Sequence, residues 1–214
     1  MRVLVTGAGG QTGRLVVESL VGAGHDVLGV VRSPQAAADL QAAGAASRVC
    51  DLTQLAPSEL VSMFEGEDAA VWAAGAGYGA DPEVVDGDAC IAASTAADAA
   101  GVSRWVQISS MYADRPEQGQ PFLQPVLRAK RRSDEAVAST GLGWTVIRAG
   151  GLTNDIGTGQ VHLGSLLDSG MVSRADVAAV ALACLATPST ARSAFDLVSG
   201  MTPIDAALRA LAPE

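Results

Sequence analysis

Three glycines near the start of the chain, Gly7, Gly10 and Gly13, are spaced three residues apart between an apolar run and a helical pattern. Glycines at these positions would permit a tight turn, a close approach of a phosphate group to the backbone, and close packing of the following helix. The helix N-terminus, with the amides of Gln11 and Thr12, would add free N–H donors and partial positive charge. A glycine triplet alone is a weak signal, and an ordinary glycine turn is the alternative. Its position nevertheless predicts a loop that binds the pyrophosphate of a dinucleotide.

Arg32 follows the second apolar run, where folds that bind NAD usually carry an acidic residue for the ribose hydroxyls. A guanidinium cannot accept those hydroxyl hydrogens, but it can hold a 2′-phosphate with two parallel hydrogen bonds. Ser33 could add a hydrogen bond, and Arg14 could lie nearby. The alternative is that Arg32 is a solvated loop cation. We therefore predict NADP as the cofactor in preference to NAD.

Short apolar runs alternate with helical patterns along the chain, and these elements must position the residues above. Predicted strands cover residues 2–6, 26–31, 47–50, 69–73, 104–108, 144–148 and 194–198, and predicted helices cover 15–21, 35–43, 82–100, 125–140, 174–186 and 204–211. Strands of this apolar type are buried on both faces of a parallel sheet, and right-handed crossovers then place helices on both faces. The predicted fold class is α/β, a doubly wound parallel sheet (a Rossmann fold) that binds its ligand at the carboxyl ends of the strands.

The chain of 214 residues is predicted to form one domain, 1–214, with 152–173 as a flexible substrate-side loop or small cap because this stretch is rich in glycine and has little pattern. Just after it, Arg174 and Asp176 are interpreted as a structural pair.

Composition and charge limit the partners that the chain can have. A net charge of −9 disfavours nucleic acid, and no apolar run is long enough for a membrane span. Three scattered cysteines fit neither a metal site nor a disulfide framework, and no signal peptide is recognisable, so a cytoplasmic location is expected. The expected partner is a small molecule, and a homodimer stays open.

Further segments add to the glycine loop, namely residues 24–27, 31–32, 50–52, 73–77, 99–110, 130, 139–148 and 174–178. Together, and in this order, they resemble the atypical short-chain dehydrogenase/reductases, whose members include NAD(P)-binding, epimerase/dehydratase-like and NmrA-like proteins. The resemblance spans nearly the whole chain and is therefore far more specific than the glycine loop alone.

The resemblance implies roles for residues at the ends of four of the predicted strands and for one residue on a predicted helix. Asp51 and Leu52 would contact the adenine, and Ala73, Ala74 and Gly75 would line the ribose and diphosphate. The residues implied around the nicotinamide are Ser109, Ser110, Lys130, Ala149, Gly150, Gly151 and Leu152. Lys130 would hold the hydroxyls of the nicotinamide ribose.

The chain departs from this family at its catalytic pair, Tyr-x-x-x-Lys, in which the Lys cation lowers the pKa of the Tyr one helical turn away. If Lys130 is that Lys, the Tyr position holds Val126, which cannot exchange a proton. Tyr112 could supply the missing donor, or it could be a loop aromatic that closes the pocket. Ser109 could orient a substrate carbonyl or cap the end of its strand. Lys130 could instead lie on a solvated basic face with the arginines at 128, 131 and 132. We retain Ser109, Tyr112 and Lys130 as candidate catalytic residues.

Two functions from different classes fit these residues. The first is an NADP-dependent oxidoreductase that transfers hydride to a small conjugated acceptor, flavin-like or quinone-like, because the cofactor carries the chemistry and the usual Tyr is then dispensable. The alternative is a non-catalytic NADP(H)-binding redox sensor or regulator that resembles the NmrA-like proteins. A sugar epimerase or dehydratase fits less well because that chemistry depends on the Tyr.

Overall fold

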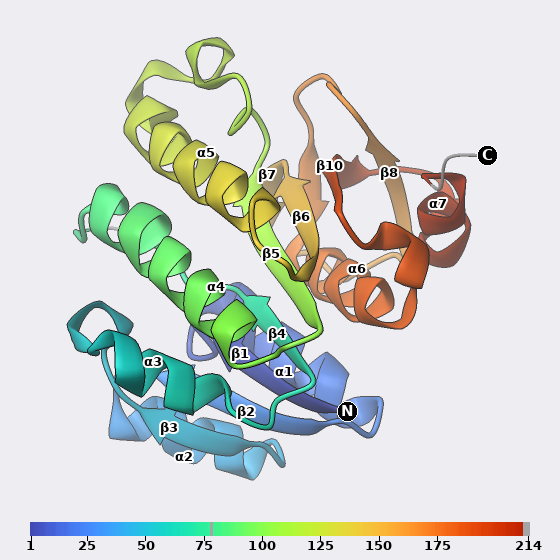
Figure 1. Cartoon of the computed structure of the whole chain (residues 1–214). Coiled ribbons are helices and arrows are strands. Elements are labelled where there is room, and N and C mark those ends of the chain that lie inside the picture. The colour runs from blue at the N-terminus through green and yellow to red at the C-terminus, as the bar shows by residue number, and fades with distance from the viewer. Residues whose placement is uncertain (78, 212–214) are drawn as a thin grey trace.

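The computed structural model describes residues 1–77 and 79–211 (Figure 1). The described strands are β1 (Arg2–Thr6), β2 (Asp26–Val31), β3 (Ala46–Val49), β4 (Ala69–Trp72), β5 (Arg104–Ser110), β6 (Gly143–Ala149), β7 (Gly151–Thr153), β8 (Gln160–Gly164), β9 (Met171–Ser173), β10 (Ser193–Ser199) and β11 (Thr202–Pro203). Nine of these described strands form one sheet in the order β11-β8-β10-β6-β5-β4-β1-β2-β3, and β7 pairs with β9 beside it. Neighbours from β3 to β10 are parallel, whereas β8 is antiparallel to both of its neighbours.

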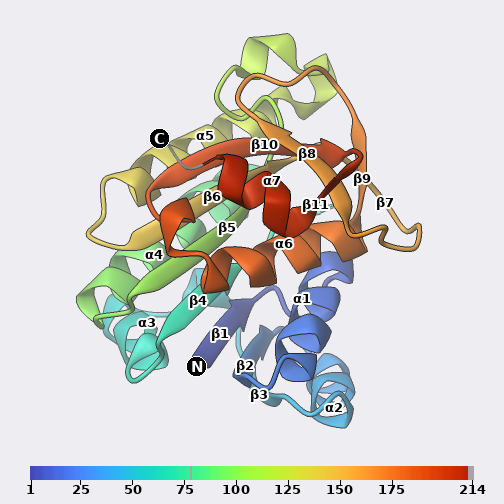
Figure 2. The same cartoon turned by 90° about the vertical axis from the view of Figure 1, so that its right-hand side faces the viewer.

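Helices cover both faces of the sheet. The helices are α1 (Gln11–Gly22), α2 (Pro34–Ala42), α3 (Pro57–Phe64), α4 (Cys90–Ala99), α5 (Gln124–Ala138), α6 (Arg174–Ala186) and α7 (Ile204–Ala210). On one face lie α1, α2, α6 and α7, and on the other lie α3, α4 and α5 (Figures 1 and 2). The predicted doubly wound α/β fold is confirmed. Among the helices of the described residues, none has both the length and the apolar character that crossing a bilayer requires.

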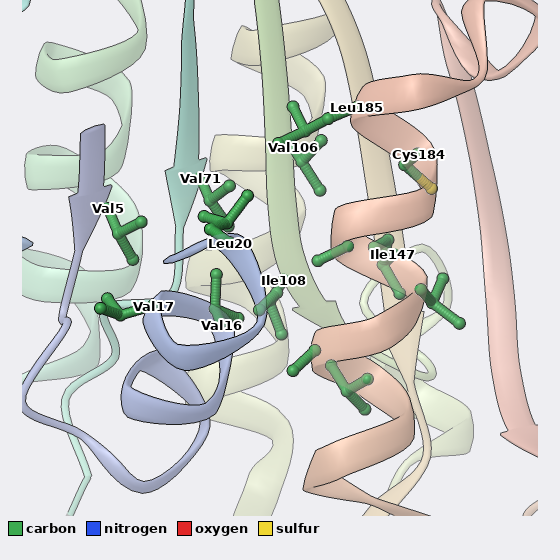
Figure 3. Close-up of a cluster of buried hydrophobic side chains, with 14 of the residues drawn as sticks. Val5, Val16, Val17, Leu20, Val71, Val106, Ile108, Ile147, Cys184 and Leu185 are labelled. Carbon is green, nitrogen blue, oxygen red and sulfur yellow. The ribbon is translucent and has the colours of Figure 1, made fainter. Parts of the chain in front are cut away.

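The central strands alternate their side chains between two apolar cores. On β1, Val3 and Val5 face α1 and α6, whereas Leu4 faces α3 and α4, and all three are fully buried. Figure 3 shows Val5 and Ile147 among side chains of the α1 and α6 core. Burial of such a side chain stabilises the fold by about 1.5–3 kcal/mol, which explains why the sequence of these strands is continuously apolar.

Two helical segments differ from the prediction. The helix expected over 82–100 is divided into a π-helical segment, Glu83–Ala89, and α4. Helix α3 was not predicted, although Pro57 at its first position and the Glu59 carboxylate, which accepts a hydrogen bond from the Ala56 N–H at 2.8 Å, are ordinary start signals.

The stretch 152–173 carries three short strands rather than a loop without structure, and its expected role as a substrate-side loop or small cap stays a prediction. Strand β8 joins the main sheet, and β7 and β9 pair with each other. The Asp176 carboxylate accepts hydrogen bonds from the Ser173 hydroxyl at 2.8 Å and from the backbone N–H groups of Thr158 and Gly159 at 3.0 and 2.8 Å. Arg174 donates to the Asn154 side chain instead. The predicted Arg174–Asp176 pair is therefore wrong, and Asp176 anchors the turn before β8.

Candidate dinucleotide site

The glycines between β1 and α1 are required by close backbone contacts. Gly7 has φ +65°, and a Cβ there would lie 2.5 Å from the Ala74 Cα. A Cβ on Gly13 would lie 2.2 Å from the carbonyl oxygen of Gly7. Gly10 is the N-cap of α1, and no side chain caps this helix end. The N–H groups of the first turn of α1 therefore stay available to an anion.

A cavity of about 580 Å³ opens beside this turn, across the carboxyl ends of β1, β2, β3 and β4. Eight of the predicted cofactor residues line it, namely Gly7, Gly10, Arg32, Asp51, Leu52, Ala73, Ala74 and Gly75. The sequence analysis missed other lining residues, which are Gly9, Val30, Val31, Ala36, Cys50, Thr53, Trp72, Ala80, Asp81, Val84, Val85 and Ala89. The lining residues between 80 and 89 carry no motif that could have revealed them, because the sequence pattern there predicts only an ordinary helix.

Arg32 and Asp51 follow β2 and β3, and both line the same end of the cavity. The Asp51 carboxylate accepts hydrogen bonds from the hydroxyl and the backbone N–H of Thr53, at 2.8 and 3.0 Å. These bonds, with the nearby Arg32 charge, hold the pKa of Asp51 below its usual value. The Ser33 hydroxyl oxygen accepts from the Ala36 N–H at 3.3 Å and so caps α2. Arg14 pairs with Asp39 at 3.5 Å.

The remaining predicted residues do not line this cavity. Gln11, Thr12 and Gly13 form the start of α1, directly after the glycine turn. Ala149 is buried at the end of β6, where its carbonyl oxygen accepts a hydrogen bond from the Met111 N–H at 2.8 Å. Gly151 begins β7, and its N–H donates to the Gly170 carbonyl oxygen at 2.8 Å. Ser109 and Lys130 belong to a polar cluster between β5 and α5.

Lys130 is not on a solvated basic face, so that alternative is wrong. Its side chain is 15% exposed, and its ammonium lies 2.8 Å from the carboxylate of buried Asp86. The other Asp86 oxygen accepts a hydrogen bond from the Ala76 N–H at 3.0 Å, next to the cavity. Burial lowers the pKa of Lys130, but the Asp86 and Asp134 carboxylates together outweigh burial, so this pKa lies above its usual value. The neighbouring Arg131 and Arg132 are paired with acidic side chains.

One turn further along α5, Asp134 forms the centre of a buried hydrogen-bond network. Its carboxylate accepts from the Ser109 hydroxyl at 3.1 Å, from the Gln107 amide at 2.8 Å and from the Arg148 Nε at 3.2 Å. Asp134 is 4% exposed, and burial raises its pKa above the usual value despite these donors. The sequence analysis missed Asp134, although its place four residues after Lys130 puts it on the same helix face.

Tyr112 lies in the turn after β5 with φ +69°, a backbone conformation that is uncommon for residues other than glycine. The Arg115 guanidinium lies over its ring, 4.9 Å from the centroid. Arg115 in turn pairs with buried Asp196 on β10 at 3.0 Å. Tyr112 does not line the cavity, and Val126, at the position of the family's tyrosine, is half-buried on α5.

A mostly parallel sheet with a glycine turn, an uncapped helix N-terminus and a cavity across its strand ends defines a Rossmann-like, dinucleotide-binding type of protein. Residues 7–188 match the family described as NAD(P)H-binding, and the chain belongs to this family.

The chain is 38% identical over 215 residues to a Bacillus subtilis protein described as an uncharacterized sugar epimerase, with 99% of this chain and all of the relative covered. It is also similar to the solved structure of a candidate NAD-dependent epimerase/dehydratase from Bacillus halodurans, with a TM-score of 0.91, 29% identity, and 99% and 100% of the two chains covered. An anaerobilin reductase from Escherichia coli O157:H7 shares the fold, with a TM-score of 0.81, 22% identity, and 93% and 97% coverage.

Proposed function

We propose that this protein binds NADP(H) and is an oxidoreductase that transfers hydride to a small conjugated acceptor, flavin-like or quinone-like. The observation that carries the proposal is the cavity that runs from Arg32 past the glycine turn to Gly75. Membership of the NAD(P)H-binding family supports the cofactor class.

The residues of the cavity fit the parts of a dinucleotide. The absence of a Cβ at Gly7 and Gly13 leaves the backbone of the turn close-packed, and the uncapped start of α1 offers N–H donors to the diphosphate. Leu52 would pack on the adenine. Arg32 and the hydroxyl of Ser33 would bind the 2′-phosphate, which makes NADPH the preferred form.

The acceptor class follows from the groups at the other end of the site. NADPH, when bound, supplies a hydride, so the protein has to position the acceptor and manage one proton. Val126 offers no acid or base, which disfavours the alcohol and sugar chemistry that depends on a tyrosine in similar proteins. Ser109 would orient the acceptor, Lys130 would hold the nicotinamide ribose, and Ala149 and Gly151 would border the nicotinamide. One protein that shares the fold is an anaerobilin reductase, which is in keeping with a conjugated acceptor.

A non-catalytic NADP(H) sensor is the second candidate. The observation that favours it is the Lys130 ammonium, which already pairs with Asp86 at 2.8 Å, together with valine at position 126. Such a protein would bind the cofactor and change a partner surface without turnover. For either function we propose a cytoplasmic location, in keeping with three free cysteines.

The test is a titration of the protein with NADPH and, separately, NADH. Trp72 lines the cavity, so tryptophan fluorescence should report binding, and a ligand at 100 times its Kd should stabilise the fold by about 2.7 kcal/mol. NADPH oxidation is then followed with flavins and quinones as acceptors. Tight NADPH binding with steady turnover is the expected result. Binding without turnover by any acceptor would favour the sensor, and no binding of either nucleotide would overturn both.

A further inference from the structure

A second cavity lies between α5 and β6, and Asp134 is among the residues that line it. It has a volume of about 320 Å³, and its lining includes Asp134, Arg148 and Trp144. Two further lining residues, Arg131 and Glu135, have side chains that are 50% and 65% exposed, so the cavity opens to solvent. Asp134 therefore contacts both Ser109 and the second cavity. One of its carboxylate oxygens accepts a hydrogen bond from the Ser109 hydroxyl at 3.1 Å, and the residue is part of the cavity lining.

The groups around Asp134 can hold its carboxyl in place in either protonation state. Gln107 donates to Oδ1 at 2.8 Å, and Arg148 donates to Oδ2 at 3.2 Å. The titratable groups that face Asp134 are Lys130 on its own helix, Arg148 on β6 and Cys90 on α4. Burial raises the pKa of Asp134, which brings its proton exchange closer to neutral pH.

We propose that Asp134 and Ser109 form a proton relay that supplies the acceptor in place of the absent tyrosine. The inference rests on the proposed reductase function and names its proton donor. When hydride has been added to the acceptor, the reduced anion takes the Ser109 hydroxyl proton, and the electron pair of that O–H bond stays on Oγ. The protonated Asp134 carboxyl then gives its proton to Oγ, which restores the hydroxyl. Water that enters the second cavity then gives a proton to the Asp134 carboxylate and leaves as hydroxide to the solvent.

The other candidate donors are engaged elsewhere. The Lys130 ammonium pairs with Asp86, and loss of its proton would leave that buried carboxylate without a counter-charge. The Tyr112 ring packs beneath the Arg115 guanidinium, which lies 4.9 Å from the ring centroid. Ser109, by contrast, is at the carboxyl end of β5, where a doubly wound sheet binds its ligand.

The test compares Asp134→Asn, Ser109→Ala and Tyr112→Phe with a control, Ser133→Ala. The control removes a buried hydroxyl from the same face of α5, which bonds to the Lys130 carbonyl and to Gln107 but not to the Asp134 carboxyl. General acid catalysis contributes about 10²–10⁴-fold, and water can replace part of it. We expect Asp134→Asn and Ser109→Ala each to lower kcat roughly 10- to 100-fold, with the Kd for NADPH within about twofold of wild type.

Two further readouts separate a relay from a structural role. The turnover of the wild type should fall as pH rises through the pKa of Asp134, and the Asp134→Asn variant should lose this dependence. In the free protein, an infrared pH titration should show the carbonyl band of a protonated carboxyl that is absent in Asp134→Asn and present in Ser109→Ala and Ser133→Ala. This second readout does not depend on cofactor or turnover.

The following results would contradict the proton relay. If Asp134→Asn turns over like Ser133→Ala, or if it loses NADPH affinity in proportion to kcat, Asp134 is structural. If Tyr112→Phe alone loses the rate, Tyr112 is the donor. If the wild type turns over but the infrared band is missing, only the relay has failed. If the wild type binds NADPH and reduces no acceptor, the proposed reductase function has failed, and the relay with it.

Discussion

The ammonium of Lys130 on α5 lies 2.8 Å from the carboxylate of Asp86, which belongs to the π-helical segment before α4. Asp86 also accepts the Ala76 N–H, so one carboxylate ties α5 to the loop that follows β4. Short π-helical segments occur often at functional sites, because the extra residue changes where a side chain points. Here the segment places Asp86 at the border of the cavity beside the glycine turn, whose lining includes Gly75.

Removing the positive partner of this pair should destabilise the protein. In Lys130→Met the Asp86 carboxylate, which is 2% exposed, would stay buried without its counter-charge. Breaking a buried pair typically costs about 3–5 kcal/mol, and we expect about 3 kcal/mol because the Lys130 side chain is 15% exposed. Urea denaturation measures the loss. The double variant Lys130→Met/Asp86→Asn should recover most of it, and a double variant as unstable as the single one would contradict this account.

Two glycines of the same helix should respond in opposite ways to alanine. A Cβ at Gly13 would lie 2.2 Å from the Gly7 carbonyl oxygen, whereas a Cβ at Gly22 would meet nothing within 4 Å. Gly13→Ala should therefore destabilise the protein by about 1–3 kcal/mol and weaken NADPH binding at least roughly tenfold. Gly22→Ala should stabilise it by up to about 1 kcal/mol with unchanged binding. Equal effects at the two positions in urea denaturation and NADPH titration would argue against a steric role for Gly13.

The parts of the site that could be predicted from the sequence are those that local rules determine. The glycine turn and the residues directly after β2, β3 and β4 follow from local rules, and eight of the predicted cofactor residues line the cavity. The Lys130–Asp86 pair joins segments far apart in the chain, and no local pattern links them. Asp134 could have been predicted from the sequence, because its spacing of four residues from Lys130 places both on one helix face.

The strands in the stretch 152–173 were not predicted from the sequence, and the reason is different. Strand β8 has five residues, and its alternation between buried Val161 and exposed His162 is too short to separate a strand from a loop. Its order also depends on a distant contact, the Asp176 carboxylate, which binds the turn at Thr158 and Gly159.

Arg32 should decide between the two nicotinamide cofactors. If its guanidinium binds the 2′-phosphate, Arg32→Ala removes charge-assisted hydrogen bonds of about 1.5–3 kcal/mol, which corresponds to a roughly 10- to 100-fold rise in the Kd for NADPH. The Kd for NADH should change by less than about threefold, because NADH has no 2′-phosphate. Arg128→Ala, which removes an exposed guanidinium on α5 that bonds to Gln124, is the matched control and should change neither value. A parallel loss for both nucleotides would mean that Arg32 does not read the 2′-phosphate.

The stability of the protein should depend on pH through Asp134. Burial raises the pKa of Asp134 above 3.8, so between that value and its native pKa the folded state holds a proton that the unfolded chain has released. The stabilisation from this proton is complete below the ordinary pKa and is lost as pH rises through the native pKa. Asp134→Asn removes the titration, so the difference in unfolding free energy between wild type and variant should shrink as pH rises over this window. Urea denaturation at a series of pH values measures it, with Ser133→Ala as the control whose difference from wild type should stay constant. A constant difference for Asp134→Asn as well would mean that the carboxyl stays ionised in the folded protein, because only a proton bound differently by the two states makes stability depend on pH.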